Sequence, residues 1–298
     1  MPREPVRYQS PDEDSRRWEE FNFRTGDIVI STRSKSGTTW MQMICALLIF
    51  QTVELPVRLD QLSPWFDWLG APVDTVVARL DAQTHRRFVK THTPLDGIPI
   101  NPRATYIVVA RHPLDLAVSL YHQGDNLNRA RIAELTGQPP PSPTDAASRP
   151  DLHEWLCGWI DLDIPPRDAL DLLPGVMWHL TDAWARGHEP NILIVHYDDL
   201  ITDLDGEMRR IAAALAIDVP QDRWTDLVHA ATFDEMRSHA DSVAPDPAEI
   251  LEDRARFFRR GSSGAGRELL TDAEFEHYQE RAASLAPPDL LAWLHRSP

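Results

Sequence analysis

The sequence predicts an α/β fold, a single domain in which a central, mostly parallel sheet is flanked by helices. Four short apolar runs are rich in β-branched residues, as is typical of buried strands. Stretches with the composition and length of helices lie between and after these runs. Alternating strands and helices favour a parallel sheet that is covered on both faces.

The first strand is expected at residues 27–31, where the β-branched run IVI lies. Residues 32–37 form the following loop. Residues 38–50 are apolar almost all round and are long enough to form a buried helix. A second short strand is expected at residues 87–90. Residues 27–90 are therefore predicted to form a strand, a loop, a helix and, at their end, a second strand.

Residues 104–110 are the strongest strand prediction, because this continuous apolar run shows no alternation with polar residues. Pro113 suits the first turn of the next helix, which is expected to reach about residue 122. A further strand is expected at residues 192–196, followed by a helix at 203–214. Ligands of such sheets bind beyond the carboxyl ends of the strands, so the residues after each strand are the candidate site.

The chain of 298 residues is expected to form one domain over its whole length. Residues 1–24 are predicted to be an N-terminal arm with a short helix around 16–23. The Pro- and Ser-rich segment at 138–150 is predicted to be a mobile loop, because the sheet resumes after it. From residue 222 onward the chain reads as helical and charged, with a group of arginines at 254–260.

The composition argues against several classes of protein. A formal net charge of −16 disfavours a general nucleic-acid binder, which needs a broad positive field. The two cysteines, Cys45 and Cys157, show no zinc-type spacing, so no metal site is predicted and a reducing compartment fits. The longest apolar run, at residues 44–50, is too short to span a bilayer, so no stable membrane insertion is expected. We therefore predict a cytoplasmic protein.

The segment Lys35–Trp40 after the first strand has the features of an anion cradle. Gly37 allows the backbone to approach a ligand closely, and the amides that follow lie at a helix N-terminus, where negative charge is favoured. The hydroxyls of Thr38 and Thr39 add donors. The order differs from a Walker A loop, because the lysine comes first. The alternative interpretation is a plain glycine turn with a capping threonine.

Basic residues also follow the second and third strands. His92 is placed to act as a general base, although a lone histidine is more often structural. Arg111 is a candidate phosphate ligand, with Ser119 eight residues later, and its alternative role is a salt bridge to Asp115. Because Lys35, His92 and Arg111 each follow a different strand, one shared site is a better explanation than three coincidences.

These motifs resemble the cytosolic-type sulfotransferase family. Residues 35–40 match its phosphosulfate loop K-S-G-T-T-W, 90–94 match K-T-H-x-P, and 111–119 match R-x-P-x-D-x-A-V-S. Weaker matches occur at residues 197–199, 232–236 and 259–261. The likeness extends over about residues 25–270 and implies the P-loop-kinase-like sulfotransferase fold. Within the family, residues 88–97 and 285–294 look most like a mycobacterial glycolipid sulfotransferase.

The resemblance implies a co-substrate, 3′-phosphoadenosine 5′-phosphosulfate (PAPS), and a role for each matching residue. The 5′-phosphosulfate would be held by Lys35, Ser36, Gly37, Thr38 and Thr39. The adenine would contact Trp40, Tyr197, Thr232, Phe233 and Met236. The 3′-phosphate would be held by Arg111, Ser119, Arg259, Arg260 and Gly261. His92 would be the general base, with Lys35 and Lys90 beside the transferring group and no metal taking part.

The sequence departs from the family in two places. The late loop of the family usually runs R-K-G-x-x-G-D-W, whereas Ala265 and Gly266 replace the final pair here. Closure of this loop over the nucleotide is therefore in question. The dimer segment K-x-x-x-T-V-x-x-x-E is not recognisable before Arg254, so a homodimer is possible but is not implied.

The acceptor is expected to be a hydroxyl on a small hydrophobic or glycolipid molecule. Two apolar clusters could wall its pocket or could simply pack in the core: Trp65, Phe66, Trp68 and Leu69, and Trp155, Leu156 and Trp159. His179 and Trp184 are expected to be structural.

Two other functions stay open at this point. An ATP- and Mg²⁺-dependent phosphotransferase could use Asp198 and Asp199 as metal ligands. A non-catalytic PAPS-binding protein would also fit the altered late loop.

Overall fold

The computed structural model describes residues 4–139 and 149–296. Its centre is a sheet in the order β2-β1-β3-β4, in which neighbouring strands are parallel. The strands are β1 (Ile28–Ser31), β2 (Phe88–Thr91), β3 (Thr105–Ala110) and β4 (Ile192–His196). The predicted strands are therefore confirmed, each within one residue of its expected bounds.

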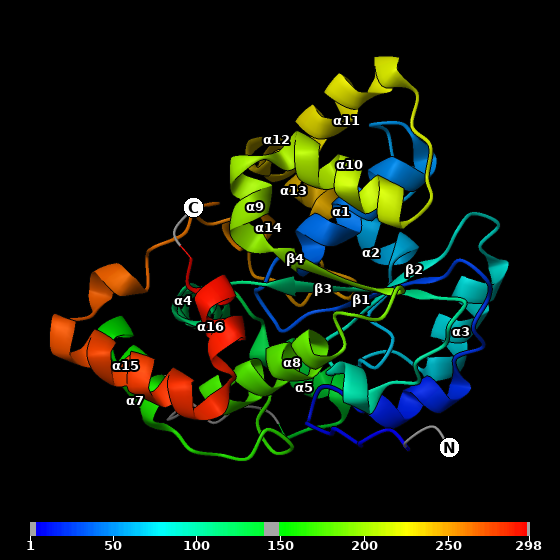
Figure 1. Ribbon diagram of the computed structural model, residues 1–298. Helices are drawn as coiled ribbons and strands as arrows, with labels where there is room; N and C mark the ends of the chain where they lie inside the picture. The colour runs from blue at the N-terminus through cyan, green and yellow to red at the C-terminus, as the bar shows by residue number, and fades with distance from the viewer. Residues whose placement is uncertain (1–3, 140–148, 297–298) are drawn as a thin grey trace.

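Helices cover both faces of the sheet, which lies edge-on between them in Figure 1. The layer above the sheet contains α1 (Thr38–Phe50), α2 (Leu59–Leu62), α9 (Tyr197–Thr202), α10 (Leu204–Ala214), η3 (Gln221–Arg223), α11 (Trp224–Ala230), α12 (Phe233–Ser238), α13 (Ala240–Val243) and α14 (Arg254–Phe257). The predicted helix at 38–50 is confirmed as α1.

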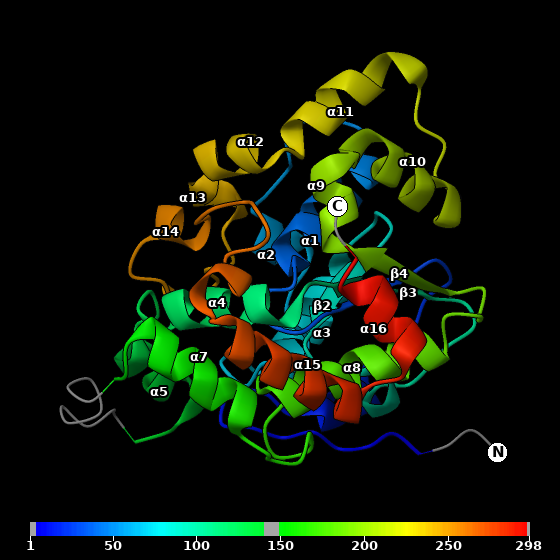
Figure 2. The same ribbon diagram turned by 60° about the vertical axis from the view of Figure 1, so that its left-hand side comes forward.

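The layer below the sheet is seen in Figure 1 and, from a second side, in Figure 2. It contains η1 (Ser15–Glu20), α3 (Val73–Ala82), η2 (Leu95–Gly97), α4 (Pro113–Gly124), α5 (Arg129–Thr136), α7 (Leu152–Asp161), α8 (Leu173–Ala185), η4 (Arg267–Leu269), α15 (Asp272–Leu285) and α16 (Pro288–Leu294). Helix α4 begins at Pro113, as predicted, and ends two residues beyond the expected end.

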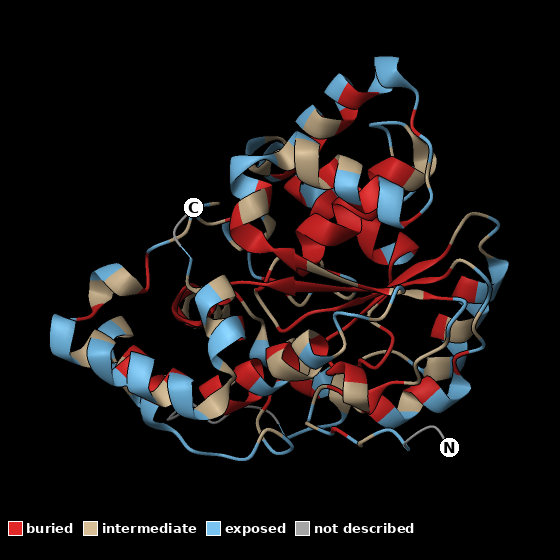
Figure 3. Cartoon of the chain, in the orientation of Figure 1, coloured by how far each residue is buried: buried red, intermediate tan, exposed pale blue. Residues whose placement is uncertain are grey.

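The strands supply side chains to two hydrophobic cores, one on each face. In β3, Ile107 and Val109 join the upper core, whereas Tyr106 and Val108 join the lower one. Successive side chains of a strand point to opposite faces, and both faces are covered here, so the run is apolar without alternation. Figure 3 shows the buried strands and α1 at the centre of the molecule.

Residues near the N-terminus pack against the lower layer. Tyr8 and Trp18 are buried, and the Tyr8 hydroxyl donates to Asp96 at 2.9 Å. The predicted short helix is η1. The predicted mobile loop at 138–150 lies mostly outside the described residues. Within the described ranges, no helix combines the length and apolar character needed to cross a bilayer.

Candidate functional site

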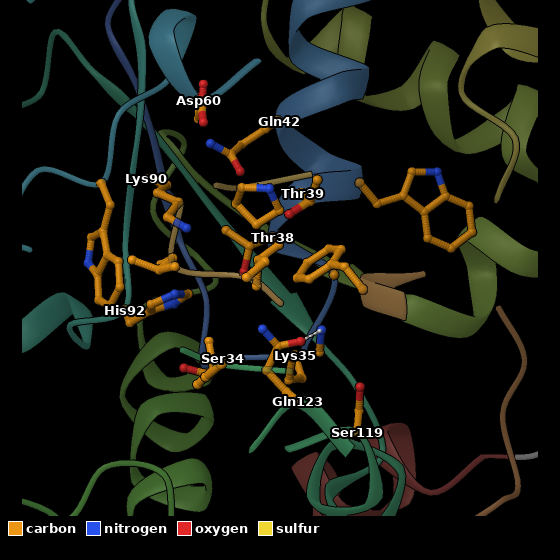
Figure 4. Close-up of a pocket in the computed structure, with 18 of the residues that line it drawn as sticks. Ser34, Lys35, Thr38, Thr39, Gln42, Asp60, Lys90, His92, Ser119 and Gln123 are labelled. Carbon is orange, nitrogen blue, oxygen red and sulfur yellow. Dashed lines mark hydrogen bonds between the residues drawn. The ribbon is translucent and has the colours of Figure 1, made fainter. Parts of the chain in front are cut away.

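A cavity of about 370 Å³ opens at the carboxyl ends of β1, β2 and β3. Parallel strands place their following residues at the same edge of the sheet, so the predicted residues meet there (Figure 4). The predicted site residues that line it are Lys35, Gly37, Thr38, Thr39, Trp40, Lys90, His92, Arg111, Ser119, Tyr197, Phe233, Met236, Arg259, Arg260 and Gly261. These residues therefore share one cavity, as their positions after the strands predicted.

Two of the predicted residues do not line the cavity. Ser36 is buried, and its backbone N–H donates to the Arg33 carbonyl at 3.1 Å. Thr232 caps α12, and its hydroxyl donates to the His229 carbonyl at 2.8 Å. The capping position turns the Thr232 side chain towards its own helix, which sequence spacing does not reveal.

The loop before α1 has the backbone that the anion-cradle prediction requires. Gly37 is left-handed, with φ of 104° and ψ of 19°. A Cβ atom at this position would lie 3.0 Å from the Tyr197 ring, so both conformation and space favour glycine. The first N–H groups of α1 follow directly and face the cavity with the positive end of the helix dipole. The Thr38 hydroxyl contacts that of Thr32.

The chain contains only two lysines, and both line this cavity. Burial, with smaller contributions from Arg111, Lys90 and Arg259, lowers the pKa of Lys35 to about 7. Burial lowers the pKa of Lys90 to about 8, against the opposing effect of Asp60 and other carboxylates. Clustered, partly desolvated cations are stabilised by a bound anion. The cavity therefore gathers groups that favour an anionic ligand over a neutral or cationic one.

The two ammonium groups have different surroundings. The Lys35 Nζ lies 3.3 Å from the Gln123 Oε1 and 3.7 Å from the centroid of the Phe257 ring. The Lys90 Nζ lies 5.0 Å from the centroid of the Trp65 ring. Lys35 therefore faces the half of the cavity that the arginines share, whereas Lys90 faces the half that contains His92 and Trp65.

His92 is held in one tautomer. Its Nδ1 lies 2.6 Å from the Thr32 carbonyl, which can only accept, so Nδ1 carries the proton. The Trp65 ring packs edge-on against the imidazole at 4.7 Å. Burial, followed by the charges of Lys90 and Arg33, lowers the pKa of His92 well below 6.5. His92 is therefore neutral at physiological pH, with the Nε2 lone pair available to accept a proton.

Arg33 is a functional neighbour that the sequence did not reveal. It is 2% exposed, and its guanidinium donates to the His92 carbonyl and forms a salt bridge with Asp171 at 2.5 Å. It therefore fixes the main chain of His92. Nothing in the spacing of the loop sets Arg33 apart from a solvent-exposed arginine.

Arg111 lies between the Lys35 loop and the late loop. Its guanidinium donates to the Lys35 carbonyl at 3.1 Å and to the Ser262 carbonyl at 3.4 Å, and lies 4.4 Å above the Tyr197 ring. The alternative role, a salt bridge to Asp115, is not formed. The Asp115 carboxylate is instead occupied by backbone N–H groups of the late loop.

The late loop is fastened to Asp115 at Gly264, which matches the family pattern, and at Gly266, which departs from it. Gly264 and Gly266 donate their N–H groups to the two oxygens of Asp115, at 2.8 and 2.9 Å. A Cβ atom at Gly266 would lie 2.4 Å from that of Leu114, so glycine allows the loop to approach α4. Ala265 is buried. The loop is therefore closed against α4 despite the absence of the Asp-Trp pair.

Aromatic residues form the wall beyond the Lys35 loop. The Trp40 Nε1 donates to the Ala231 carbonyl at 2.8 Å, and the ring meets Tyr197 edge-on at 5.3 Å. Phe233 packs against Phe258, with ring centroids 5.9 Å apart. These rings are held by their own contacts and add apolar surface to the cavity wall.

The first predicted apolar cluster partly lines the cavity, whereas the second packs in the core. Trp65 and Trp68 line the cavity beside His92, whereas Phe66 between them is in the lower core. Leu156 and Trp159 are core residues, so the second cluster serves packing. Other apolar residues on the cavity wall are Ala71, Val76, Leu120, Leu127, Ile132, Ile250 and Leu251. Polar side chains interrupt this wall at Asp12, Ser34, Arg79, Arg129 and Asp171.

The residues expected to be structural have internal partners. His179 is buried, with its Nε2 3.0 Å from the Ser31 hydroxyl, and the Trp184 Nε1 donates to Asp289 at 2.8 Å.

The two aspartates that could have been Mg²⁺ ligands, Asp198 and Asp199, have other partners. Asp198 accepts from the Ser263 hydroxyl, and Asp199 forms a salt bridge with Arg296 at 2.5 Å. Neither aspartate lines the cavity, which removes the observation that favoured a phosphotransferase.

This chain is similar to known proteins over most of its length. The model of the sulfotransferase domain matches residues 25–288. The chain is 41% identical to a glycolipid sulfotransferase of Mycobacterium bovis over 309 residues, covering 97% of this chain and 94% of that protein. A glycolipid sulfotransferase of Mycobacterium tuberculosis is 42% identical over 308 residues, with the same coverage. Among solved structures, retinol dehydratase in complex with androsterone and the inactive cofactor PAP has a TM-score of 0.65 at 20% identity, covering 96% of this chain and 88% of that one.

Proposed function

This chain belongs to the sulfotransferase family, and from that membership we propose that it transfers a sulfuryl group from PAPS to a hydroxyl of a glycolipid. The proposal depends on one observation. Lys35, His92 and Arg111, from three different strand ends, line one cavity together with the N-terminus of α1. Cations and helix N–H groups suit the phosphosulfate, whereas the neutral imidazole suits a hydroxyl that must lose its proton.

We assign the nucleotide to the half of the cavity that Arg111 and the late loop share. Lys35 and the amides of residues 37–39 would hold the 5′-phosphosulfate. Arg111, Arg259 and Arg260 would form forked hydrogen bonds to the 3′-phosphate, which guanidinium does better than ammonium. Ser119 and Gly261 lie beside them, and Trp40, Tyr197, Phe233 and Met236 would surround the adenine.

Sulfuryl transfer requires an oxygen–sulfur bond to form as another breaks, with the two oxygens in line. His92 would take the proton of the acceptor hydroxyl on Nε2 as that oxygen attacks sulfur. Lys35 and the loop amides would stabilise the negative charge that grows on the departing 5′-phosphate. The products are the sulfated acceptor and 3′-phosphoadenosine 5′-phosphate. Lys90 would lie near the equatorial oxygens of the group in transit.

The acceptor half of the cavity supports a glycolipid rather than a wholly apolar alcohol. Trp65, Trp68 and Val76 offer apolar surface, while Asp12, Arg79, Arg129 and Asp171 place charged groups on the same walls. Sugar hydroxyls need hydrogen-bonding partners, whereas acyl chains need apolar contact. A molecule that carries both parts fits this mixture. The cytoplasmic location stays a prediction, and the oligomeric state stays open.

A radiolabelled transfer assay tests the proposal. The protein is incubated with sulfur-35 PAPS and, in parallel, with purified glycolipids, simple phenols and steroid alcohols. We expect label on a glycolipid at a rate that exceeds the rate with the other acceptors. Calorimetric binding of the desulfated nucleotide without transfer to any acceptor would instead favour a non-catalytic nucleotide-binding protein.

The pH dependence of kcat/KM for PAPS follows from the lowered pKa values. Lys35 must be cationic to bind the phosphosulfate, and its pKa of about 7 means that this form is lost as the pH rises through about 7. His92 must be neutral, and its lowered pKa keeps it so throughout that range. We expect kcat/KM to fall about tenfold per pH unit above that point.

The conservative variant Lys35→Arg identifies the group that causes this fall. The pKa of arginine lies above about 12, so the variant should lose the alkaline fall below about pH 9 even if its overall rate is lower. An unchanged alkaline limb in Lys35→Arg would assign the titration to another residue.

Asp115 provides a test of the closed late loop. Asp115→Ala removes two hydrogen bonds to a carboxylate, each worth about 1.5–3 kcal/mol, and leaves two N–H groups of the loop without a partner. We expect the dissociation constant of 3′-phosphoadenosine 5′-phosphate to rise at least about tenfold. Trypsin should also cleave faster after Arg259 and Arg260. The matched control is Asp205→Ala on the exposed face of α10.

Gly266→Ala should produce the same effects without a change of charge, because the new Cβ collides with Leu114. If both variants bind the nucleotide normally, the contacts between Asp115 and the loop do not position the nucleotide ligands.

A further inference from the structure

Three side chains with metal-ligating atoms meet on the surface where α7 packs against α15, outside the cavity. His153 and Cys157 lie one helical turn apart on α7, and Glu274 lies in the first turn of α15. Figures 1 and 2 both show these two helices side by side. One ligand atom from each residue lies within 4.8 Å of the other two. None of the three lines the cavity of the transfer reaction.

The distances between the ligand atoms match those of a small tetrahedral site. The His153 Nε2 lies 3.1 Å from the Glu274 Oε1 and 3.8 Å from the Cys157 Sγ, and the Sγ lies 3.7 Å from the same Oε1. Zinc bonds of about 2.3 Å to sulfur and about 2.0–2.1 Å to nitrogen and oxygen require separations of roughly 3.3–3.6 Å. One cation can therefore reach all three atoms with movements of a few tenths of an ångström.

The triad is also held in place by its own helices. A spacing of four residues places His153 and Cys157 on one face of α7. The Glu274 Oε2 accepts from the backbone N–H and the hydroxyl of Thr271, each at 2.8 Å, and lies 3.2 Å from the His153 Nε2, whereas Oε1 is the oxygen near both the histidine and the thiol. Outer partners that orient a ligating carboxylate in this way are a regular feature of metal sites.

The electrostatics of the triad favour a cation. Asp151 and Asp161 add negative charge near the Cys157 thiol. A thiolate and a carboxylate together balance the charge of one divalent ion.

We propose that His153, Cys157 and Glu274 bind a borderline-soft divalent cation of the zinc type, which joins α7 to α15. The cation takes the His153 Nε2, the Cys157 Sγ and the Glu274 Oε1, and a water molecule fills the fourth position. Cys157 releases its thiol proton to solvent as the sulfur–metal bond forms. A thiolate and an imidazole exclude Mg²⁺ and Ca²⁺, which prefer oxygen ligands.

Cobalt binding tests the proposal with a readout that is independent of sulfuryl transfer. Full-length, tag-free, reduced protein is titrated with Co²⁺, whose bond to a thiolate gives a near-ultraviolet charge-transfer band. We expect saturation at one equivalent and loss of the band when one equivalent of Zn²⁺ is added. Absence of a thiolate band in the wild-type protein would overturn the proposal.

Variants locate the site. Cys157→Ser should abolish the band, and His153→Ala should weaken Zn²⁺ binding by more than the ~10–100-fold that loss of an outer partner costs. Glu274→Gln keeps a capping residue at the start of α15 but removes the anionic ligand, so it should also weaken binding. The matched control is His277→Ala, because His277 is exposed on the same helix and pairs with Asp161 instead.

Circular dichroism of each variant shows whether it is folded, so a loss of metal binding is assigned to the missing ligand only in variants with the wild-type spectrum. A thiolate band that persists in Cys157→Ser would assign the metal to Cys45 and refute the site. Equal Zn²⁺ affinity in the wild-type protein and the three triad variants would also refute it.

Discussion

Replacing His92 with alanine is expected to abolish sulfuryl transfer while leaving nucleotide binding almost unchanged. The substitution removes the Nε2 lone pair that would take the hydroxyl proton, a contribution typically worth about 10²–10⁴-fold in rate. The residues assigned to the two phosphates lie on the Lys35 loop, α4 and the late loop, so their contacts do not pass through the imidazole. The effect should therefore appear in kcat and not in the dissociation constant.

Single-turnover transfer and calorimetric titration with 3′-phosphoadenosine 5′-phosphate measure the two quantities separately. His188→Ala, on an exposed turn, controls for loss of a histidine as such. Added imidazole should partly restore transfer in His92→Ala if the cavity left by the side chain admits it. A His92→Ala enzyme with wild-type kcat would remove the base assignment and leave the nucleotide site intact.

Replacing Lys35 with methionine is expected to lower kcat about 10²–10³-fold, the usual cost of one lost donor in the transition state. Methionine keeps much of the length and apolar surface of the side chain, although the cation–π contact with the Phe257 ring is lost. The charge and the hydrogen bonds to the departing phosphate are lost. Nucleotide affinity should also fall, by a smaller factor, because the same ammonium contacts the ground state.

The small number of lysines makes this assignment unusually direct to test. Lys35 and Lys90 are the two lysines of the chain, so a lysine-directed reagent should modify the cavity. The lowered pKa of Lys35 makes this amine reactive near neutral pH. We expect bound nucleotide to protect Lys35 from the reagent, as measured by peptide mass mapping. The control for the loss of charge in Lys35→Met is Arg103→Met, because Arg103 is exposed. Labelling of Lys35 at the same rate with and without nucleotide would place the phosphosulfate elsewhere.

The cationic cavity explains how a strongly acidic protein can bind a polyanion. The net charge of −16 repels anions at long range, but salt screens that field within about 8 Å. Inside the cavity, Lys35, Lys90 and the arginines are partly removed from water and dominate the local potential. We expect nucleotide affinity to depend on these few groups rather than on the overall charge.

The linear sequence determined the elements of the fold and most of the nucleotide half of the site. Residues 28–30 of β1 and 106–110 of β3 do not alternate between apolar and charged side chains because both faces of the sheet are covered, which is a local signal of a buried parallel strand. The motif from Lys35 to Trp40 also carries its geometry locally, because Gly37 and the start of α1 are adjacent in the chain. Parallel pairing then brings His92 and Arg111 to the same edge.

Only the tertiary structure decided which side chains support these groups. Arg33 contacts the His92 carbonyl, Asp115 contacts the late loop about 150 residues away, and Glu274 meets Cys157 across two packed helices. Ser36 and Thr232 matched the family pattern but do not line the cavity. These outcomes depend on how helices pack over the sheet. The direction of a side chain across such an interface is set by contacts distant in sequence, which no local pattern of residues records.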